Sequence, residues 1–344
     1  MTEQIRFVLL GLGNIGRNLL DILVHRQKQI EADYGLSFVL VGAVDSSGAA
    51  VSQEGLDMAR VRDLKLGREG VADYPGMGRR GMVALEVLES VRADVLVGAS
   101  PTNLRSGEPG LSAVRFALNA GMDVVMADKG PLVLAYQELM ALAKQQQVEI
   151  RFSGTVAGGL PTVNLGVRDL AGSGILRVEG IFNGTTNYIL TRMEQEQISY
   201  EEALAGAQKA GIAEADPTLD VDGWDAANKL VIIANSALKR PTKLSDLTVE
   251  GIRNITLEDL QQARREGKVI KPLAMAVLQD GDYQLSVKPV ALDARHPLAM
   301  TNKWDMGVVY YSDYMGVIIA IIEEKGPVPT SAAVLRDMIN IYSN

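Results

Sequence analysis

The stretch Gly11-Leu12-Gly13-Asn14-Ile15-Gly16 decides the fold expected for the first half of the chain. A short apolar run at residues 5–10 precedes it, and residues 14–32 follow with apolar side chains at helical spacing. A G-x-G-x-x-G motif is informative when it lies in this way between a strand and a helix. The stretch therefore predicts a strand, a tight turn and a helix whose N-terminus binds a dinucleotide.

Each glycine of the motif has its own physical task. Gly11 permits the turn, Gly13 lets the backbone approach a pyrophosphate, and Gly16 lets helix and strand pack closely. Asn14 and Ile15 begin the helix, where free N–H groups and the dipole favour the phosphates. The alternative is a glycine turn that serves packing alone, but the position of the motif and the aspartate at the end of the next strand favour the cofactor site.

Further strand-like runs lie at residues 38–44, 94–98 and 123–127, and a helix-compatible stretch at 111–120 separates the last two. A repeated order of strand and helix predicts a parallel, doubly wound sheet with right-handed crossovers. We therefore expect an α/β fold whose first domain is a Rossmann-type dinucleotide-binding domain over residues 1–150.

Asp45 ends the second predicted strand, where its carboxylate would accept hydrogen bonds from the ribose hydroxyls and repel a 2′-phosphate. The residue therefore favours NAD over NADP. Two features weaken that preference: the separation from Gly16 exceeds the usual spacing of about 20 residues, and Arg17 would suit a phosphate. A strand-end cap is the structural alternative for Asp45.

The glycine-rich segment 151–182 marks a change of character, and mixed strand signals follow between residues 270 and 322. We expect an α+β catalytic and dimerisation domain with a mixed sheet over residues 151–325. The C-terminal residues 326–344, which include an amphipathic helix pattern, would complete the first domain.

Composition excludes several kinds of chemistry. The 344 residues include two histidines and no cysteine, which excludes disulfides, thiolate metal sites and cysteine nucleophiles. The formal charge of −8, from 34 Lys and Arg against 42 Asp and Glu, and the lack of a dense basic stripe argue against nucleic-acid binding. No apolar run approaches the roughly 20 residues that span a bilayer, and no signal-peptide pattern begins the sequence. We expect a soluble cytoplasmic protein whose proton transfers fall to Lys, Asp, Glu, Tyr or water.

Residues 180–189 end a predicted strand in small hydrogen-bonding residues before a helix starts. Their N–H and hydroxyl groups would suit a carboxylate. A helix cap by Asn183 or Thr185 is the alternative, and residue chemistry alone favours it.

A second polar stretch, residues 211–230, places one lysine in an otherwise apolar helix behind five carboxylates: Glu214, Asp216, Asp220, Asp222 and Asp225. Asp225 and Lys229 are four residues apart on one helical face. A surface ion pair worth roughly a few tenths of a kcal/mol is one interpretation. The apolar residues after Lys229 favour another, in which a partly desolvated lysine flanked by carboxylates acts as acid or base.

These residues resemble homoserine dehydrogenase, in a short form without the C-terminal regulatory domain of longer family members. The similarity extends over nearly the whole chain, through residues 11–16, 127–131, 156–161, 183–188, 220–229 and 296–299. The resemblance implies an oxidoreductase that interconverts L-homoserine and L-aspartate 4-semialdehyde with NAD or NADP, in threonine and methionine biosynthesis. A homodimer is also implied, with the strands of residues 270–322 as its contact.

The resemblance also implies roles for individual residues. Lys229 is the catalytic proton donor or acceptor, and Lys129 is a second active-site lysine near the nicotinamide and the reacting oxygen. The substrate would be held by Glu214, Asp225, Asp220, Gly184 and Thr185. The cofactor would also be contacted by Ser100, Lys129 and Gly211. A monovalent cation, Na⁺ or K⁺, would bind the carbonyls of Val156, Gly158 and Leu160. Ser153 stands where the family usually adds a glutamate to that cation site.

Two further segments depart from the family pattern. Residues 322–330 hold Glu323 and Glu324, where the family has a glycine-rich loop beside the cofactor. Residues 304–307 begin with a tryptophan, where the family commonly has an asparagine followed by alanine. The departures keep two alternatives open: a dehydrogenase of another small amino or hydroxy acid, and a non-catalytic dinucleotide-binding sensor. Without a regulatory domain, we expect turnover that is insensitive to threonine.

Overall fold

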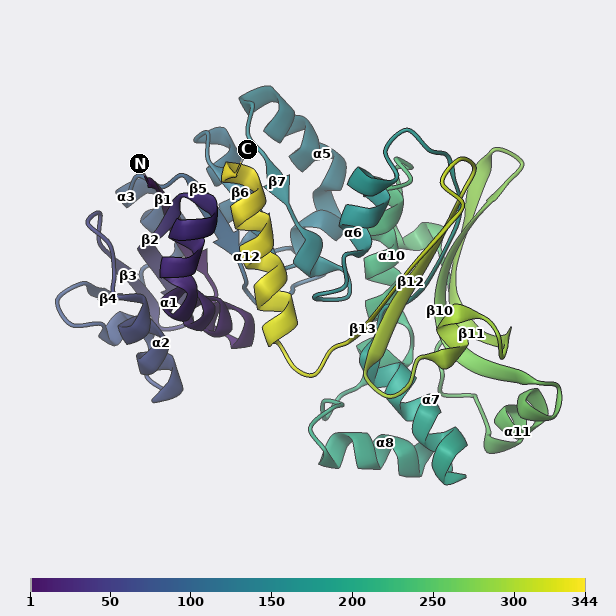
Figure 1. Cartoon of the computed structure of the whole chain (residues 1–344). Helices are drawn as coiled ribbons and strands as arrows, with labels where there is room; N and C mark the ends of the chain where they lie inside the picture. Colours follow the sequence, from purple (N-terminus) through teal and green to yellow (C-terminus); the bar gives the residue numbers. More distant parts are fainter. Residues whose placement is uncertain (1, 344) are drawn as a thin grey trace. The chain divides into compact units, whose positions relative to one another are not determined.

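The computed structural model describes residues 2–343, which form two compact units (Figure 1). The first unit runs to Gly159 and resumes at Gly326, and the second comprises Leu160–Lys325. The glycine-rich turn that follows residue 150 therefore lies in the first unit. One reason is a contact within that unit: the N–H and the hydroxyl of Ser153 both donate to the buried carboxylate of Asp337, each at 2.7 Å.

A seven-stranded sheet forms the centre of the first unit, in the order β4-β3-β2-β1-β5-β6-β7. Its parallel strands are β1 (Glu3–Leu10), β2 (Leu36–Asp45), β5 (Val95–Gly98), β6 (Asp123–Met126) and β7 (Ile150–Arg151). The predicted Rossmann-type α/β sheet is confirmed. Two antiparallel strands extend it, β3 (Gly48–Val51) and β4 (Gly78–Arg80). The sequence analysis missed them because strands of four and three residues are too short to show a period.

The helices of this unit within residues 2–343 are α1 (Asn14–Tyr34), α2 (Met58–Leu66), α3 (Ala84–Ser90), α4 (Gly110–Asn119), α5 (Gly130–Gln146) and α12 (Val328–Tyr342), with 3-10 turns η1 (Val71–Asp73) and η2 (Ser153–Thr155). Helix α12 packs on α1, where Ser331 donates its hydroxyl to the carbonyl of Ile15 at 2.9 Å. Val334 and Met338 of α12 are fully buried in the same apolar cluster as Leu19 of α1. The C-terminal helix is therefore part of the core beneath the glycine motif.

The second unit is built on a six-stranded sheet of order β13-β12-β8-β10-β11-β9. Its strands are β8 (Ile175–Ile181), β9 (Thr248–Val249), β10 (Lys268–Gln279), β11 (Asp282–Asp293), β12 (Asp305–Ser312) and β13 (Val317–Glu323). All neighbours are antiparallel except β11 and β9, which run parallel. The sheet is therefore mixed, as predicted for the second part of the chain.

The described helices of the second unit are α6 (Thr162–Asn164), α7 (Gly184–Glu196), α8 (Tyr200–Lys209), α9 (Thr218–Val221), α10 (Trp224–Ser236) and α11 (Leu257–Arg265), with short turns η3 (Leu165–Asp169), η4 (Leu244–Asp246) and η5 (Pro297–Met300). Ile189 and Met193 of α7 share an apolar core with Ala203 of α8 and Val221 of α9. This core brings the turn before α7 close to the α8–α9 loop and the start of α10. Within residues 2–343, no helix has both the length and the apolar character that a membrane span requires.

Candidate active site

The glycine motif folds as a tight turn between β1 and α1. Gly11 has a φ of +101°, and a Cβ at this position would lie 2.3 Å from the carbonyl oxygen of Ala99. A Cβ on Gly16 would lie 2.1 Å from the carbonyl oxygen of Gly11. Gly13 is the N-cap residue of α1, where no side chain caps the helix, and a Cβ at this position would meet no atom within 4 Å. The turn therefore leaves the first N–H groups of α1, from Asn14 onward, accessible to an anion.

A cavity of about 320 Å³ opens beside this turn. Its lining includes Gly11, Asp45 and Ser46 at the end of β2, and Ser100 after β5. The cavity therefore lies at the carboxyl ends of parallel strands on both sides of β1, where open α/β sheets bind their ligands. This is the position that the sequence predicted for the nucleotide.

The carboxylate of Asp45 already accepts hydrogen bonds from three residues of its own unit. Its Oδ2 accepts from Lys65 Nζ at 2.5 Å and from the N–H of Val71 at 3.1 Å, and its Oδ1 accepts from the N–H and the hydroxyl of Ser47. Burial by itself raises the pKa of Asp45, but these hydrogen bonds together hold the pKa below its usual value. The carboxylate thus stays ionised at the strand end, and Lys65 compensates part of its charge.

Ser100 and Lys129 lie beside a buried aspartate. Ser100 donates its hydroxyl to Asp128 Oδ2 at 3.0 Å, and the N–H of Gly130 donates to Asp128 Oδ1 at 2.9 Å. Asp128 is 3% exposed, and burial raises its pKa despite these donors. Lys129 is half-buried at the start of α5. The sequence analysis did not single out Asp128, although the motif at residues 127–131 contained it.

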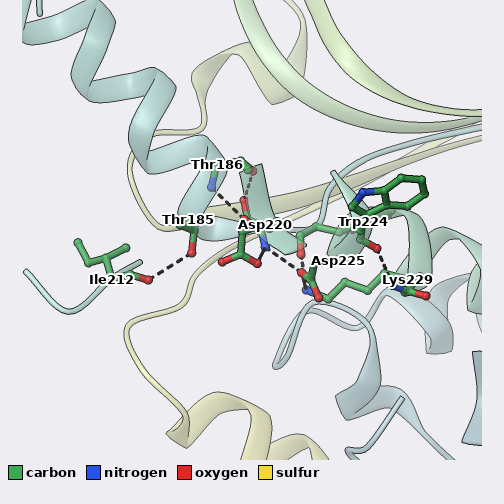
Figure 2. Close-up of polar contacts among 10 residues, drawn as sticks. Thr185, Thr186, Ile212, Asp220, Trp224, Asp225 and Lys229 are labelled. Atoms are coloured by element: carbon green, nitrogen blue, oxygen red, sulfur yellow. Dashed lines mark hydrogen bonds and ion pairs between the residues drawn. The ribbon is translucent and has the colours of Figure 1, made fainter. Parts of the chain in front are cut away.

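The second unit brings Lys229, Asp225 and Asp220 close together (Figure 2). Lys229 Nζ donates to Asp225 Oδ2 at 2.7 Å and to the carbonyl oxygen of Phe182 at 2.6 Å. The amide of Asn183 donates to Asp225 Oδ2 at 2.8 Å and to Asp220 Oδ1 at 2.7 Å. We call Asn183, Asp220, Asp225 and Lys229 the lysine–carboxylate cluster.

Local structure places each member of this cluster. Asn183 follows β8 and caps α7, because its Oδ1 accepts from the N–H of Thr186 at 2.9 Å. Gly184 is then the first residue of α7. Asp225 lies in the first turn of α10, and Lys229 lies one turn later on the same face. The helix-cap interpretation of Asn183 is therefore correct, and the same amide also holds both carboxylates.

The lysine–carboxylate cluster is mostly shielded from solvent. The side chains of Lys229 and Asp225 are 14% and 12% exposed, so their ion pair is not a surface pair. Burial raises the pKa of Asp220, and the charge of Asp225 raises it further, against the opposing effects of Asn183 and Lys229. A lysine with a fixed Nζ position in such surroundings is suited to proton transfer.

Other predicted site residues lie in the loop between α8 and α9. Thr185 donates its hydroxyl to the carbonyl of Ile212 at 3.3 Å, which ties this loop to the start of α7 (Figure 2). Gly211 follows α8 in the left-handed region, with φ +70°, and Glu214 is exposed further along the loop. No hydrogen bond among residues 2–343 joins the Glu214 side chain to the lysine–carboxylate cluster.

The turn at residues 153–160 carries the carbonyls predicted to bind a cation, those of Val156, Gly158 and Leu160. Ser153 uses its N–H and its hydroxyl on Asp337, and the same hydroxyl accepts from Arg336 at 2.9 Å. Across the described residues 2–343, no group of three or more His, Asp or Glu side chains could hold a metal ion. Because its hydroxyl already bonds to Asp337 and Arg336, the side chain of Ser153 is committed to α12.

Known proteins support the same interpretation as the geometry. A family model described as homoserine dehydrogenase matches residues 161–339. The homoserine dehydrogenase of Methanocaldococcus jannaschii is 36% identical over 337 residues, covering 98% of this chain and 98% of its own length. The chain belongs to the homoserine dehydrogenase family.

Two further homoserine dehydrogenases extend the comparison. The NAD(+)-dependent homoserine dehydrogenase of Pseudomonas canavaninivorans is 35% identical, covering 100% of this chain and 97% of its own length. A solved structure of a hyperthermophilic archaeal homoserine dehydrogenase mutant in complex with NADPH matches with a TM-score of 0.85 at 25% identity, covering 98% of both chains. Membership of this family confirms the resemblance seen in the sequence, the predicted fold class and an NAD(P)-dependent oxidoreductase activity.

Proposed function

We propose that this member of the homoserine dehydrogenase family interconverts L-homoserine and L-aspartate 4-semialdehyde with Lys229 as the proton donor and acceptor. The observation that supports this most is the position of Lys229 Nζ, held 2.7 Å from Asp225 and 2.6 Å from the Phe182 carbonyl oxygen. NAD(P) supplies or accepts the hydride when it is bound. The chain itself must bind the amino acid, orient its carbinol carbon and move one proton.

Lys229 acts at the reacting oxygen of the substrate. In reduction its ammonium donates a proton to the developing alkoxide, and in oxidation the neutral amine accepts the hydroxyl proton. Asp225 stabilises the ammonium form, and the Phe182 carbonyl restricts where Nζ can lie. Removal of Lys229 would therefore slow the chemical step and leave nucleotide binding largely intact.

Asp220, Asp225 and Glu214 bind the substrate ammonium group in this proposal. Asp220 and Asp225 both accept from the Asn183 amide, so their two carboxylates lie close together. Lys229 is the cationic member of the lysine–carboxylate cluster and pairs with Asp225. The excess of negative charge in a partly buried site attracts a small cationic group. Glu214 would add a third carboxylate from the exposed α8–α9 loop.

The remaining site residues contact substrate or cofactor through small groups. Gly184 and Thr185, at the start of α7, line the substrate turn, and Gly211 contacts the cofactor from the α8–α9 loop. In the nucleotide-binding unit, Ser100 and Lys129 contact the nicotinamide half of the cofactor. The hydrogen bond from Ser100 to the buried Asp128 supports this assignment, because it fixes the segment after β5 beside the start of α5.

We propose NAD as the preferred cofactor. Asp45 lines the cavity at the end of β2, and its lowered pKa keeps a carboxylate at that position. Such a carboxylate accepts hydrogen bonds from the ribose hydroxyls and repels a 2′-phosphate. The relative from Pseudomonas canavaninivorans is named NAD(+)-dependent. Because Lys65 offsets part of the Asp45 charge, we expect NADP to be used as well, at lower efficiency.

A monovalent cation, Na⁺ or K⁺, is dispensable in this proposal. Its ligands would be the carbonyls of Val156, Gly158 and Leu160. No side-chain charge joins them, because Ser153 replaces the family's glutamate and is bonded to Asp337. Oxygen ligands without net charge hold a cation weakly. No step of the reaction therefore passes through a cation.

We also propose a homodimer formed through the sheet of the second unit. β13 is an edge strand, and Val317, Ile319 and Ile321 on one of its faces are 54%, 48% and 46% exposed. Large aliphatic side chains side by side on an exposed edge are typical of a surface that is covered in solution. A second copy of the chain would cover them by a self-complementary contact.

The test of the catalytic assignment is the oxidation of NADH by L-aspartate 4-semialdehyde. We expect Lys229→Ala to lose about 10²–10⁴-fold in kcat, the range typical of a lost general acid or base. NADH affinity, measured by fluorescence titration, should stay within about twofold. Lys209→Ala removes an exposed lysine at the end of α8 and should leave kcat unchanged.

Two results would contradict the proposal in different ways. Turnover of Lys229→Ala near the wild-type rate would remove the lysine from the mechanism. NADH binding by the wild type without turnover of the semialdehyde would favour a different substrate or the non-catalytic sensor.

A further inference from the structure

Lys271 is a buried lysine that the proposed reaction does not use. It lies in β10, is 2% exposed, and donates to the carbonyl of Thr301 at 2.5 Å and to Asn187 Oδ1 at 3.4 Å. Burial lowers the pKa of Lys271 to about 8, although the charges of Glu194 and Asp305 act in the opposite direction. Burying an ammonium against neutral acceptors costs free energy, so the stability of the strand does not by itself explain a lysine at this position.

Asn187 connects Lys271 to the second end of the loop at residues 301–305. Its Oδ1 accepts from Lys271, and its Nδ2 donates to the carbonyl of Asp305 at 3.1 Å. Asn187 is itself fully buried in α7. Lys271 and Asn187 together therefore hold both ends of the loop at residues 301–305.

The 301–305 loop carries Trp304 against the proposed substrate turn. A Cβ placed on Gly184 would lie 3.5 Å from the carbonyl oxygen of Trp304, so the loop and the first residue of α7 are neighbours. The indole packs on Tyr188, with ring centroids 5.3 Å apart. Gly184 directly follows Asn183 of the lysine–carboxylate cluster. The position of Trp304 therefore affects the space beside the residues proposed to bind substrate.

We propose that Lys271 is a positioning residue for substrate binding: with Asn187 it fixes the 301–305 loop, so that Trp304 forms a wall beside Gly184. The location of the substrate in this inference rests on the proposed function. A lysine suits the task because one ammonium can donate to several oxygens, whereas an apolar residue would leave the Thr301 carbonyl unpaired. Lys271 acts through the loop, so substrate affinity depends on it more than proton transfer does.

The first test is Lys271→Met, which keeps an unbranched stem and removes the ammonium. We expect the KM for L-aspartate 4-semialdehyde to rise by about tenfold while kcat stays within about threefold, because a wall contributes equally to ground-state and transition-state binding. The KM for NADH should not change. The matched control is Lys268→Met on the same strand, which removes an exposed lysine paired with Glu266 and should alter neither parameter.

The second test, Trp304→Ala, changes the wall without touching the buried lysine. We expect the same rise in KM, and the double variant should show no more than the larger single effect, because both substitutions act on one wall. An unchanged KM in Trp304→Ala, or in a folded Lys271→Met, overturns the inference, and the Trp304 result decides it even if Lys271→Met fails to fold. A wild-type enzyme without turnover on the semialdehyde would count against the proposed function instead.

Discussion

Asn183 uses the two ends of one side-chain amide for two tasks. Its Oδ1 accepts from the N–H of Thr186 and caps α7, while its Nδ2 donates to Asp220 and Asp225. A carboxamide can do both because its acceptor and its donors are separate atoms. An aspartate in its place would keep the cap but put a third carboxylate against the other two. The Asn183 side chain thus caps α7 and reduces the repulsion between the carboxylates of Asp220 and Asp225.

Asp45 and Lys65 should together set the cofactor preference. Replacing Lys65 by Met leaves the Asp45 charge uncompensated, so we expect the ratio of kcat/KM for NADH to that for NADPH to rise by about tenfold. Asp45→Ala removes both the ribose acceptor and the repulsion of a 2′-phosphate, so the ratio should fall. Steady-state kinetics with both cofactors measures the effect.

The matched control for the cofactor prediction is Lys28→Met, an exposed lysine of α1 that should leave the ratio unchanged. A ratio that stays constant in both the Lys65 and the Asp45 variants would show that the carboxylate does not face the ribose.

At the scale of elements, α12 and the turn at residues 153–160 depend on each other. Asp337 of α12 is 1% exposed, and burial raises its pKa against the two hydrogen bonds from Ser153. A buried carboxylate without donors is costly, so the removal of Ser153 as a donor would destabilise α12 as well as the turn. Helix and turn are thus joined by hydrogen bonds from Ser153 to the Asp337 carboxylate.

The cation prediction is that replacement of Na⁺ and K⁺ by choline leaves kcat within about twofold, because uncharged oxygens bind a monovalent ion weakly. Ser153→Glu would place a carboxylate beside the predicted cation site but should lower the free energy of unfolding by about 1–3 kcal/mol, since Asp337 loses its hydroxyl donor to a like charge. Urea denaturation measures the change. Ser153→Ala, which keeps the N–H donor, is the milder control, and a several-fold fall of kcat in choline buffer would contradict the prediction.

At the scale of the whole molecule, the exposed stripe of β13 should decide the oligomeric state. We expect the wild type to be a dimer and Ile319→Lys to be a monomer, because burying a lysine at an apolar contact costs about several kcal/mol. Sedimentation analysis distinguishes the two states. Leu66→Lys is the matched control, since Leu66 is 61% exposed on α2 of the other unit. A monomeric wild type, or a dimer that persists in Ile319→Lys, would contradict the proposed contact.

Much of the fold could be predicted because its signals are local. The strand, glycine turn and helix of residues 5–32 each show a period or a motif over a few residues, and β2, β5 and β6 appear as apolar runs. The same approach missed β3 and β4, since strands so short carry no period. It also left the turn at residues 180–189 with two competing roles, because a helix cap and a binding site for a carboxylate use the same small hydrogen-bonding residues.

The sequence by itself determined the glycine turn and the pairing of Asp225 with Lys229, since these depend on residues within one or two turns of a helix. Only the tertiary structure decided that Ser153 meets Asp337 and that Lys271 binds the 301–305 loop. Those contacts join residues 184 and 30 positions apart, whose approach depends on sheet order and helix packing rather than on neighbouring residues. A period in the sequence specifies which face of an element is buried, but the fold alone specifies what that face is buried against.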